Sequence, residues 1–407
     1  MLKKLHIFRI FPALQIRNYQ LYFFGQLISL IGTWFQIVAQ SWLVLQLTNS
    51  AFMVGLVAAI GALPILLFAL FGGVIVDHFP KKTIIIITQA ASMILAFILG
   101  TLTLLKIISI PEIIFLAFCL GVVNAIDYPA RQAFVIEMVG KEVLASAVAL
   151  NSGVFNAARV IGPSIAGLII AFVGTGSAFI LNGISFIAVI IALIFIQTKP
   201  TFSKKNLHPI KAIKQSVAYA YAHPVIRSLL IFVAVVSIFG WSYMTILPFV
   251  AKNIFYLDAA GLGYLYSAIG LGALMATTLV SALSKNISPM IFIFGGNIIF
   301  AISLILFTFI TYIPIVLLLL MFTGLGLIAQ FSMINTTLQH TVSDEMRGRV
   351  MSLYVLMFSG LAPIGNFQIG LLAEKFGSEI AIRIGAIIVF IYGIYLMMQK
   401  NKIKERN

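Results

Sequence analysis

Long apolar stretches alternate with short polar breaks along the whole chain, and this pattern predicts an all-α membrane protein. Stretches such as 83–105 and 290–310 run for roughly 20 residues, without the two-residue alternation of barrel strands. Proline, glycine and polar breaks separate twelve predicted helices. These are 19–47, 51–76, 83–105, 112–132, 144–173, 177–197, 226–250, 260–283, 289–310, 314–338, 349–374 and 380–399.

The composition agrees with a lipid environment. Of the 407 residues, 61% are hydrophobic and 9% are charged, whereas a soluble domain carries about 25% charged residues. Surface-to-volume scaling prevents a soluble fold from hiding this much apolar surface. The single cysteine, Cys119, excludes an intramolecular disulfide.

The basic residues predict an orientation in the membrane. The formal net charge is +15, and 21 of the 26 Lys and Arg residues fall in alternate loops and at the two ends, whereas four fall in the opposite loops. The positive-inside rule explains this asymmetry better than a nucleic-acid partner does. We therefore expect both termini in the cytoplasm of a bacterial cell, with the chain in its cytoplasmic (inner) membrane.

The longest connection divides the chain into an N-terminal six-helix bundle, 1–197, a basic cytoplasmic linker, 198–225, and a C-terminal six-helix bundle, 226–407. Two interpretations of the linker stay open. It is either a plain basic connection, or it holds an amphipathic segment at 210–221 that lies on anionic lipid headgroups.

The two halves show a weak internal repeat. At an offset of 203 residues, three glycines of the fifth predicted helix match three glycines of the eleventh; the pairs are Gly162 with Gly365, Gly167 with Gly370, and Gly174 with Gly377. A second match, at an offset of 209, joins 59–61 to 268–270. Six helices per half in the same order predict parallel repeats, as in many two-bundle transporters.

A motif follows the second predicted helix. The segment 72–82 reads GGVIVDHFPKK, in which Gly72 and Gly73 favour close helix packing, and Asp77 can cap the N-terminus of a neighbouring helix. It resembles the G-x-x-x-D-x-x-G-[RK]-[RK] signature of the major facilitator superfamily, with Pro80 in place of a glycine. The resemblance implies a gating motif of Gly73, Asp77, Lys81, Lys82, Arg131 and Arg347.

Three further segments resemble the drug and siderophore (enterobactin-type) exporter branch of that superfamily. They are 127–134 with Asp127 and Arg131 spaced i,i+4, 158–167 with the proline kink Gly162-Pro163, and 344–349. The resemblance places Arg131 beside Asp77, and it favours export over uptake as the direction of transport. The alternatives are a helix-end ion pair, a generic kink and a capped helix start.

Several polar or aromatic residues are candidates to line a transport cavity. Arg159 lies within a predicted membrane helix, where an ionisable side chain is costly and marks function by default. Gln36 and Gln40 belong to a polar stripe on the first helix, and Trp241 lies in the seventh. Each has an alternative role. Arg159 would extend its side chain toward the membrane interface, the glutamines would only form hydrogen bonds between neighbouring helices, and Trp241 would belong to the aromatic belt at the interface.

The expected function is secondary active export of small hydrophobic or amphipathic molecules, such as drugs or siderophores, by alternating access. Asp127 is the candidate proton carrier, because most other acids lie in loops or at helix ends. No cofactor and no metal site are expected, and the transporter is expected to be a monomer in contact with lipid. A lysophospholipid flippase of the same fold is the alternative, and a membrane-embedded enzyme is a distant one.

Overall fold

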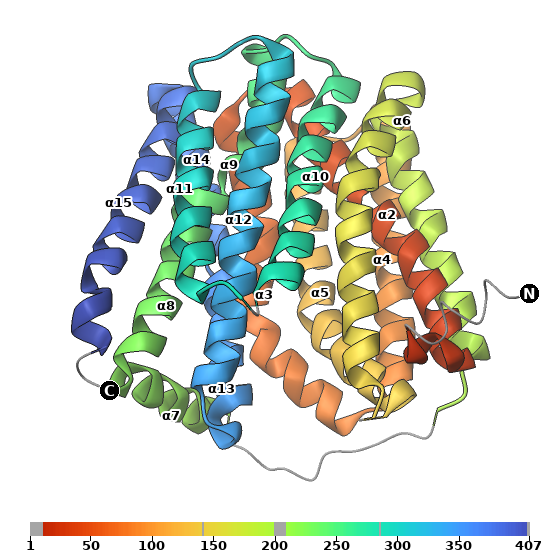
Figure 1. Ribbon diagram of the computed structural model, residues 1–407. Helices are drawn as coiled ribbons and strands as arrows, with labels where there is room; N and C mark the ends of the chain where they lie inside the picture. The colour runs from red at the N-terminus through yellow and green to blue at the C-terminus, as the bar shows by residue number, and fades with distance from the viewer. Residues whose placement is uncertain (1–10, 141, 199–208, 285, 405–407) are drawn as a thin grey trace, which may run out of the picture. The chain divides into compact units, whose positions relative to one another are not determined.

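The computed structural model describes residues 11–140, 142–198, 209–284 and 286–404, where all regular structure is helical (Figure 1). The elements are η1 Pro12–Gln15, α2 Arg17–Thr48, α3 Ala51–His78, α4 Lys81–Leu104, α5 Ile110–Val139, α6 Leu144–Phe195, α7 Pro209–Ala222, α8 Pro224–Val235, η2 Val236–Trp241, α9 Tyr243–Asn253, α10 Ala259–Leu283, α11 Pro289–Phe307, α12 Ile313–Thr341, α13 Asp344–Val355, η3 Leu356–Gly360, α14 Ala362–Phe376 and α15 Ser378–Lys404. The short elements η2 and η3 are π-helices that join α8 to α9 and α13 to α14.

Eleven helical stretches among the described residues are long and apolar enough to cross a membrane. One of them, α6, has 52 residues, which at 1.5 Å per residue is about 78 Å, more than twice the thickness of a hydrocarbon core. Its path breaks at Gly174, where φ is 82° and ψ is 169°. The predicted helices 144–173 and 177–197 are thus two crossings joined at Gly174, and the prediction of a twelve-helix membrane protein is confirmed.

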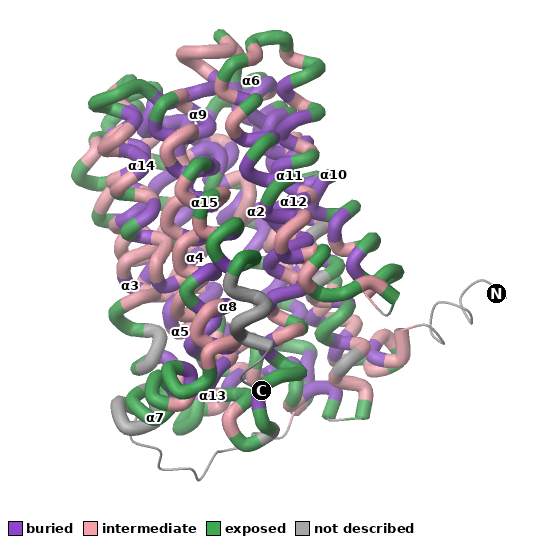
Figure 2. The backbone as a smooth tube through the Cα atoms, turned by 60° about the vertical axis from the view of Figure 1, so that its left-hand side comes forward, coloured by how far each residue is buried: buried purple, intermediate pink, exposed green. Residues whose placement is uncertain are grey.

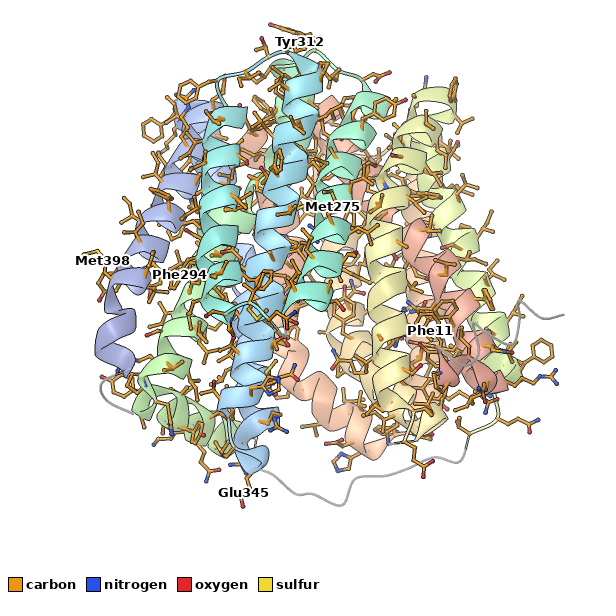
Figure 3. All side chains as sticks on the ribbon, in the orientation of Figure 1. Phe11, Met275, Phe294, Tyr312, Glu345 and Met398 are labelled. Carbon is orange, nitrogen blue, oxygen red and sulfur yellow. The ribbon has the colours of Figure 1, made fainter. Side chains whose placement is uncertain are left out.

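Apolar side chains cover much of the molecular surface. Phe172 is 83% exposed, Ile391 61% and Met398 76%, and exposed positions recur along the helices (Figure 2). The side chain of Met398 points outward from α15 (Figure 3). Exposed apolar area on this scale requires a nonaqueous surrounding, because soluble monomers rarely present large contiguous apolar patches. These faces are suited to contact with lipid tails.

The chain forms two compact units. The first contains Met1–Leu43 and Leu67–Lys205, and the second contains Val44–Leu66 and Asn206–Asn407. Helices α2 and α3 therefore each run from one unit into the other. The predicted bundles 1–197 and 226–407 have other bounds than these units, since 44–66 packs with the second unit. The two bundles stay a prediction.

In the first unit, α4 packs against both α5 and α6. A core of buried residues lies near one end of these helices and includes Tyr19, Tyr22, Ile85, Phe134 and Leu193. The hydroxyl of Tyr19 donates to the backbone oxygen of Ala147 at 2.8 Å, so α2 is tied to α6. This core includes Ala130 and contacts Ile126, which are neighbours in sequence of the candidate site described below.

In the second unit, α12 packs between α10 and α11 (Figure 1). Small residues allow this contact, since a Cβ on Gly272 would lie only 1.8 Å from the backbone oxygen of Met321. Tyr312 precedes α12 and Glu345 lies in α13, at opposite ends of the α12–α13 pair (Figure 3). Helix α7, within the predicted linker, packs against α13 and α8.

The predicted internal repeat has structural counterparts in each unit. Gly377, the match of Gly174, also has a positive φ, of 90°, and it likewise joins two helices, α14 and α15. A Cβ on Gly162 would lie 2.6 Å from the Cβ of Trp34 on the first membrane helix. A Cβ on Gly365, the match of Gly162, would lie 2.7 Å from the backbone oxygen of Ile238 on the seventh. Matching glycines therefore pack against matching helices.

Candidate functional site

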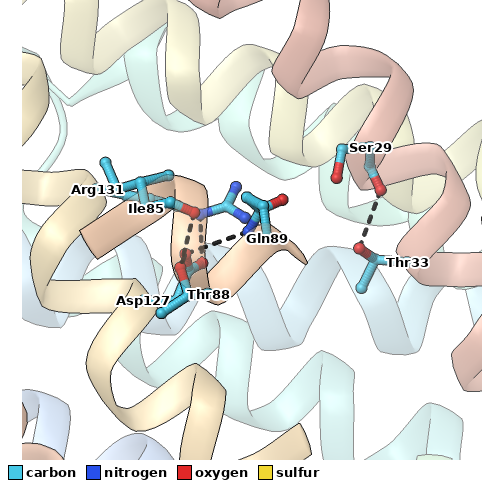
Figure 4. Close-up of polar contacts among 7 residues, drawn as sticks. All are labelled: Ser29, Thr33, Ile85, Thr88, Gln89, Asp127 and Arg131. Carbon is cyan, nitrogen blue, oxygen red and sulfur yellow. Dashed lines mark hydrogen bonds and ion pairs between the residues drawn. The ribbon is translucent and has the colours of Figure 1, made fainter. Parts of the chain in front are cut away.

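The centre of the candidate site is an ion pair on α5. Asp127 is 2% exposed, and one of its carboxylate oxygens accepts a hydrogen bond from Nε of Arg131, one helical turn further on (Figure 4). The spacing of four residues places both side chains on one helix face. The predicted i,i+4 pair is therefore present, and it is buried rather than solvated at a helix end.

Helix α4 completes the coordination of this carboxylate. The hydroxyl of Thr88 donates to Oδ1 of Asp127 at 2.6 Å, and Nε2 of Gln89 donates to the same oxygen at 3.2 Å. Thr88 and Gln89 belong to the buried face of α4, which also includes Ile85 and Ser92. Four groups of two helices thus form one polar cluster, the Asp127 cluster: Asp127, Arg131, Thr88 and Gln89.

One atom of this cluster has no protein partner. Oε1 of Gln89 is buried and accepts no hydrogen bond from any described residue. Oε1 of Gln26, on α2, is in the same situation. Buried acceptors without donors are costly, and in native structures they often mark water, a ligand or a catalytic role.

Asp127 is distinguished among the acids of the chain. It is the one buried acid among those whose side chains the structure describes, since the others are exposed or half-buried. A charge inside a membrane protein is expensive unless it is paired and hydrogen-bonded. In this arrangement the carboxylate of Asp127 is both paired with Arg131 and hydrogen-bonded by Thr88 and Gln89.

The predicted gating motif lies around the junction of α3 and α4. Asp77 is exposed, Lys81 is buried, and Lys82 donates to the backbone oxygens of Ile194 and Ile196 at 3.3 and 2.8 Å. Lys82 therefore binds the end of α6. Within the described part of the first unit, the ion pair of Arg131 is with Asp127 and not with Asp77.

The two glycines of this motif differ in packing. A Cβ on Gly72 would lie 2.3 Å from the backbone oxygen of Ala125 on α5, whereas a Cβ on Gly73 would meet nothing within 4 Å. The expected close approach thus occurs at Gly72 and not at Gly73. The α3–α5 approach lies just before Asp127 in the sequence of α5.

Arg347, the predicted member of the motif in the second unit, is exposed, and its Nε donates to the backbone oxygen of Gln339 at 2.9 Å. It thereby satisfies a carbonyl at the end of α12. The neighbouring Arg349 donates to Oε1 of Gln215 on α7 at 2.8 Å. The predicted capping of a neighbouring helix by Asp77 stays a prediction.

Arg159 is 3% exposed and lies in the first half of α6. Burial to this degree does not fit snorkelling toward headgroups. Three residues later, Gly162 packs against Trp34, and Pro163 is buried. The residue of α6 with non-helical φ and ψ is Gly174, so the kink at Gly162-Pro163 stays a prediction.

The polar stripe of α2 faces α6 at Gln36. Nδ2 of Asn182 donates to Oε1 of Gln36 at 2.5 Å, and both side chains are buried. Gln36 therefore holds two helices together, which is the alternative role weighed for it. Gln40, one turn further on, is half-buried.

Trp241 is the last residue of the π-helix η2 and belongs to an aromatic cluster. Its ring centroid lies 5.1 Å from that of Phe358 and 6.0 Å from that of Phe331. Phe358 lies in the other π-helix, η3, and its carbonyl accepts a hydrogen bond from Ser237 of η2 at 2.5 Å. π-Bulges occur often at functional sites, and this one presents Trp241 to aromatic neighbours from two helices.

The sequence alone did not identify Thr88, Gln89 or Asn182 as partners, nor the two π-helices. Thr88 and Gln89 were detectable as adjacent polar residues inside the apolar run 83–105. Their connection to Asp127 depends on the packing of α4 against α5, which spacing along one helix cannot reveal. No group of three or more His, Cys, Asp or Glu in the described residues can hold a metal ion.

The fold is that of a major facilitator superfamily transporter. A bacterial homologue of the human lysosomal transporter Spinster, in an inward-facing and unoccupied conformation, superposes with a TM-score of 0.78 at 12% identity, over 95% of this chain and 97% of that one. A D-xylose-proton symporter gives a TM-score of 0.71 at 13% identity, over 95% and 97% of the two chains. These identities establish the fold alone.

Within that superfamily, the sequence model of the family described as "transmembrane secretion effector" matches residues 10–407, and the chain belongs to this family. The staphyloferrin A transporter of Staphylococcus aureus is 27% identical, over 88% of this chain and 90% of its own. The multidrug efflux pump Tap of Mycolicibacterium fortuitum is 24% identical, over 87% and 88%. The enterobactin exporter EntS of Escherichia coli is 24% identical, over 66% and 64%. The chain is thus a multi-pass membrane transporter and not an enzyme.

Proposed function

We propose that this transporter exports siderophores or other small hydrophobic or amphipathic molecules, including drugs, by proton-coupled alternating access. Relatives named as a staphyloferrin A transporter, a multidrug efflux pump and an enterobactin exporter support export as the direction. The alternating-access mechanism is that of two-repeat transporters. The observation that carries the coupling is the buried Asp127 cluster.

Proton coupling needs one group that exchanges a proton during the cycle. Asp127 meets this need because its charge is balanced by Arg131 and by hydrogen bonds from Thr88 and Gln89. Movement of α4 relative to α5 changes this coordination, and with it the balance between the charged and neutral carboxyl. Arg131 is proposed to take a new partner when Asp127 is protonated.

The other candidate residues have proposed roles around this centre. Arg159 and Gln40 are proposed to line the substrate path of the first unit, and Gln36 to position the α2–α6 contact beside it. Trp241 is proposed to contact substrate in the second unit. Gly73, Asp77, Lys81, Lys82 and Arg347 are proposed to control the cytoplasmic gate.

The proposed location is the cytoplasmic membrane of a bacterium, with both termini in the cytoplasm. The distribution of Lys and Arg supports this orientation. The proposed working form is a monomer in contact with lipid, and its energy source is a proton gradient.

The test is export from cells. Cells that lack the protein are loaded with staphyloferrin A, enterobactin or a fluorescent lipophilic dye, and retention is compared with that in cells expressing the wild type. We expect retention of at least one of these compounds to fall on expression. Unchanged retention of all three, together with a faster movement of labelled lysophospholipid between leaflets, would favour the flippase instead.

A further inference from the structure

A second carboxylate, Glu374, binds the turn between α2 and α3. Its Oε2 accepts a hydrogen bond from the hydroxyl of Ser50 at 2.9 Å and one from the backbone N–H of Phe52 at 3.2 Å. Ser50 precedes α3, and its own Oγ accepts from the N–H of Met53 at 3.2 Å. The side chains of Glu374 and Ser50 therefore cap the first turn of α3 together, where an anion is favoured by the helix dipole.

The contact extends along both helices. A Cβ on Gly55 would lie 2.5 Å from the backbone oxygen of Asn366, and one on Gly370 would lie 3.0 Å from the Cα of Gly55. The rings of Phe52 and Phe367 are 5.8 Å apart in an edge-to-face arrangement. Helix α3 thus begins in close contact with α14, and Glu374 lies at the end of this contact.

Few charged side chains among the described residues lie on the elements that pack against α14. Lys252 of α9 donates to Oδ1 of Asn49 in the same turn at 3.1 Å. On α15, Glu379 accepts from Ser378 at 3.0 Å, and Arg383 donates to Thr308 at 2.7 Å. Lys375, the next residue of α14, is exposed, η2 and η3 carry no titratable side chain, and Tyr243 of α9 packs against Phe300.

We propose that Glu374 is a protonation-controlled latch for the first turn of α3. The ionised carboxylate holds Ser50 and Phe52, because hydrogen bonds to a charged acceptor are about twice as strong as neutral ones. Glu374 is exposed, so a proton from the medium reaches it directly. Protonation weakens both bonds and releases the turn 48–52 from α14.

The latch has a consequence for the cycle. The segment 44–66 groups with the second unit, but its chain continues into the first unit at both ends. Release of the turn 48–52 therefore loosens the packing of α3 against α14 within the second unit. The Lys and Arg distribution predicts that this turn lies outside the cytoplasm, so acid outside the cell is expected to release it. The Glu374 latch works in the same way whichever substrate is transported.

The test measures the distance between spin labels, because thiol cross-linking is itself pH-dependent. Leu47→Cys and Phe376→Cys are labelled in a Cys119→Ser background, at positions that are 46% and 56% exposed. The purified full chain in lipid nanodiscs is measured from about pH 8 to about pH 3, a range that brackets the ordinary titration of exposed carboxylates. We expect one short distance at high pH and a several-fold larger long-distance fraction at low pH.

Three variants test whether protonation of Glu374 produces the long-distance fraction. Glu374→Gln is expected to show the long-distance fraction already at high pH, with no further response to acid. Ser50→Ala keeps the acid but loses the hydrogen bond to Glu374 and the bond from the N–H of Met53. It should give an intermediate fraction that still responds to pH, because Glu374 keeps its bond to the N–H of Phe52. Glu379→Gln removes an acid from the same end of the second unit and should behave as the wild type does. A wild-type response in Glu374→Gln, or a lost response in Glu379→Gln, would overturn the latch.

Discussion

The hydroxyl of Thr88 on α4 lies 2.6 Å from Oδ1 of Asp127 on α5, and both side chains are buried. This bond joins the acid proposed for coupling to a helix other than its own. Its acceptor is a carboxylate, and a bond of this kind contributes about 1.5–3 kcal/mol to stability. The position of Asp127 therefore depends on the α4–α5 contact.

Replacement of Thr88 tests this bond. Thr88→Val keeps the side-chain shape and removes the donor, and we expect it to lower the free energy of unfolding by about 1–3 kcal/mol, measured by thermal or denaturant unfolding in detergent. Thr88→Ser retains a hydroxyl and is expected to lose less. Equal losses in the two variants would show that the methyl packing, not the bond, is what stabilises the site.

Removal of Arg131 should be more damaging than removal of the whole pair. Arg131→Met leaves the buried carboxylate of Asp127 uncompensated, and breaking a buried pair in this way costs about 3–5 kcal/mol. The double variant Asp127→Leu with Arg131→Met should recover most of that stability, because two apolar side chains replace two charges. It should also be inactive in coupled transport. A double variant as unstable as Arg131→Met would contradict this account.

Gly72 and Gly73 are neighbours that should respond differently to the same substitution. Gly72→Ala places a Cβ 2.3 Å from the backbone oxygen of Ala125, which cannot move aside without a shift of α5. We expect it to lower the unfolding temperature and the transport rate. Gly73→Ala meets nothing within 4 Å and removes a flexible residue from a helix, so its unfolding temperature should be unchanged or higher.

Gln330, on α12, has no exposed surface, and neither of its amide atoms has a hydrogen-bond partner among the described residues. An unsatisfied buried group costs about 1–3 kcal/mol. Gln330→Met should therefore raise the free energy of unfolding by about 1 kcal/mol or more. Gln36→Met is the matched control and should lower it, because Gln36 is bonded to Asn182. A loss of stability in Gln330→Met would point to an unseen partner, such as water.

The fold was largely predictable, because an apolar stretch of about 20 residues is long enough to cross the membrane as a helix. The predicted boundary at 173–177 coincides with Gly174, which the structure shows at a positive φ although α6 is otherwise continuous. A glycine break in a long apolar run was sufficient to separate two crossings. The π-helices η2 and η3 were not predictable, because each arises from packing and no residue type in those segments requires it.

In the candidate site, only contacts between residues of the same helix were predictable from the sequence. The pairing of Asp127 with Arg131 follows from a spacing of four residues, and it is present. The placement of Arg131 beside Asp77 came from the family resemblance and stays a prediction, because it depends on how helices pack. Gln36 was recognised as part of a polar stripe on the first helix, but its bond to Asn182 could not be derived from a stripe on one helix.

If Asp127 carries the coupled proton, its replacement must abolish uphill export, which can be measured in vesicles. Inside-out membrane vesicles are given an imposed pH difference, and accumulation of the exported compound is measured for the wild type, Asp127→Asn and Glu137→Gln, an acid on the same helix that is only half-buried. We expect uphill accumulation by the wild type and by Glu137→Gln, whereas Asp127→Asn should allow only downhill movement. Uphill accumulation by Asp127→Asn with an unchanged pH dependence would contradict proton coupling through Asp127.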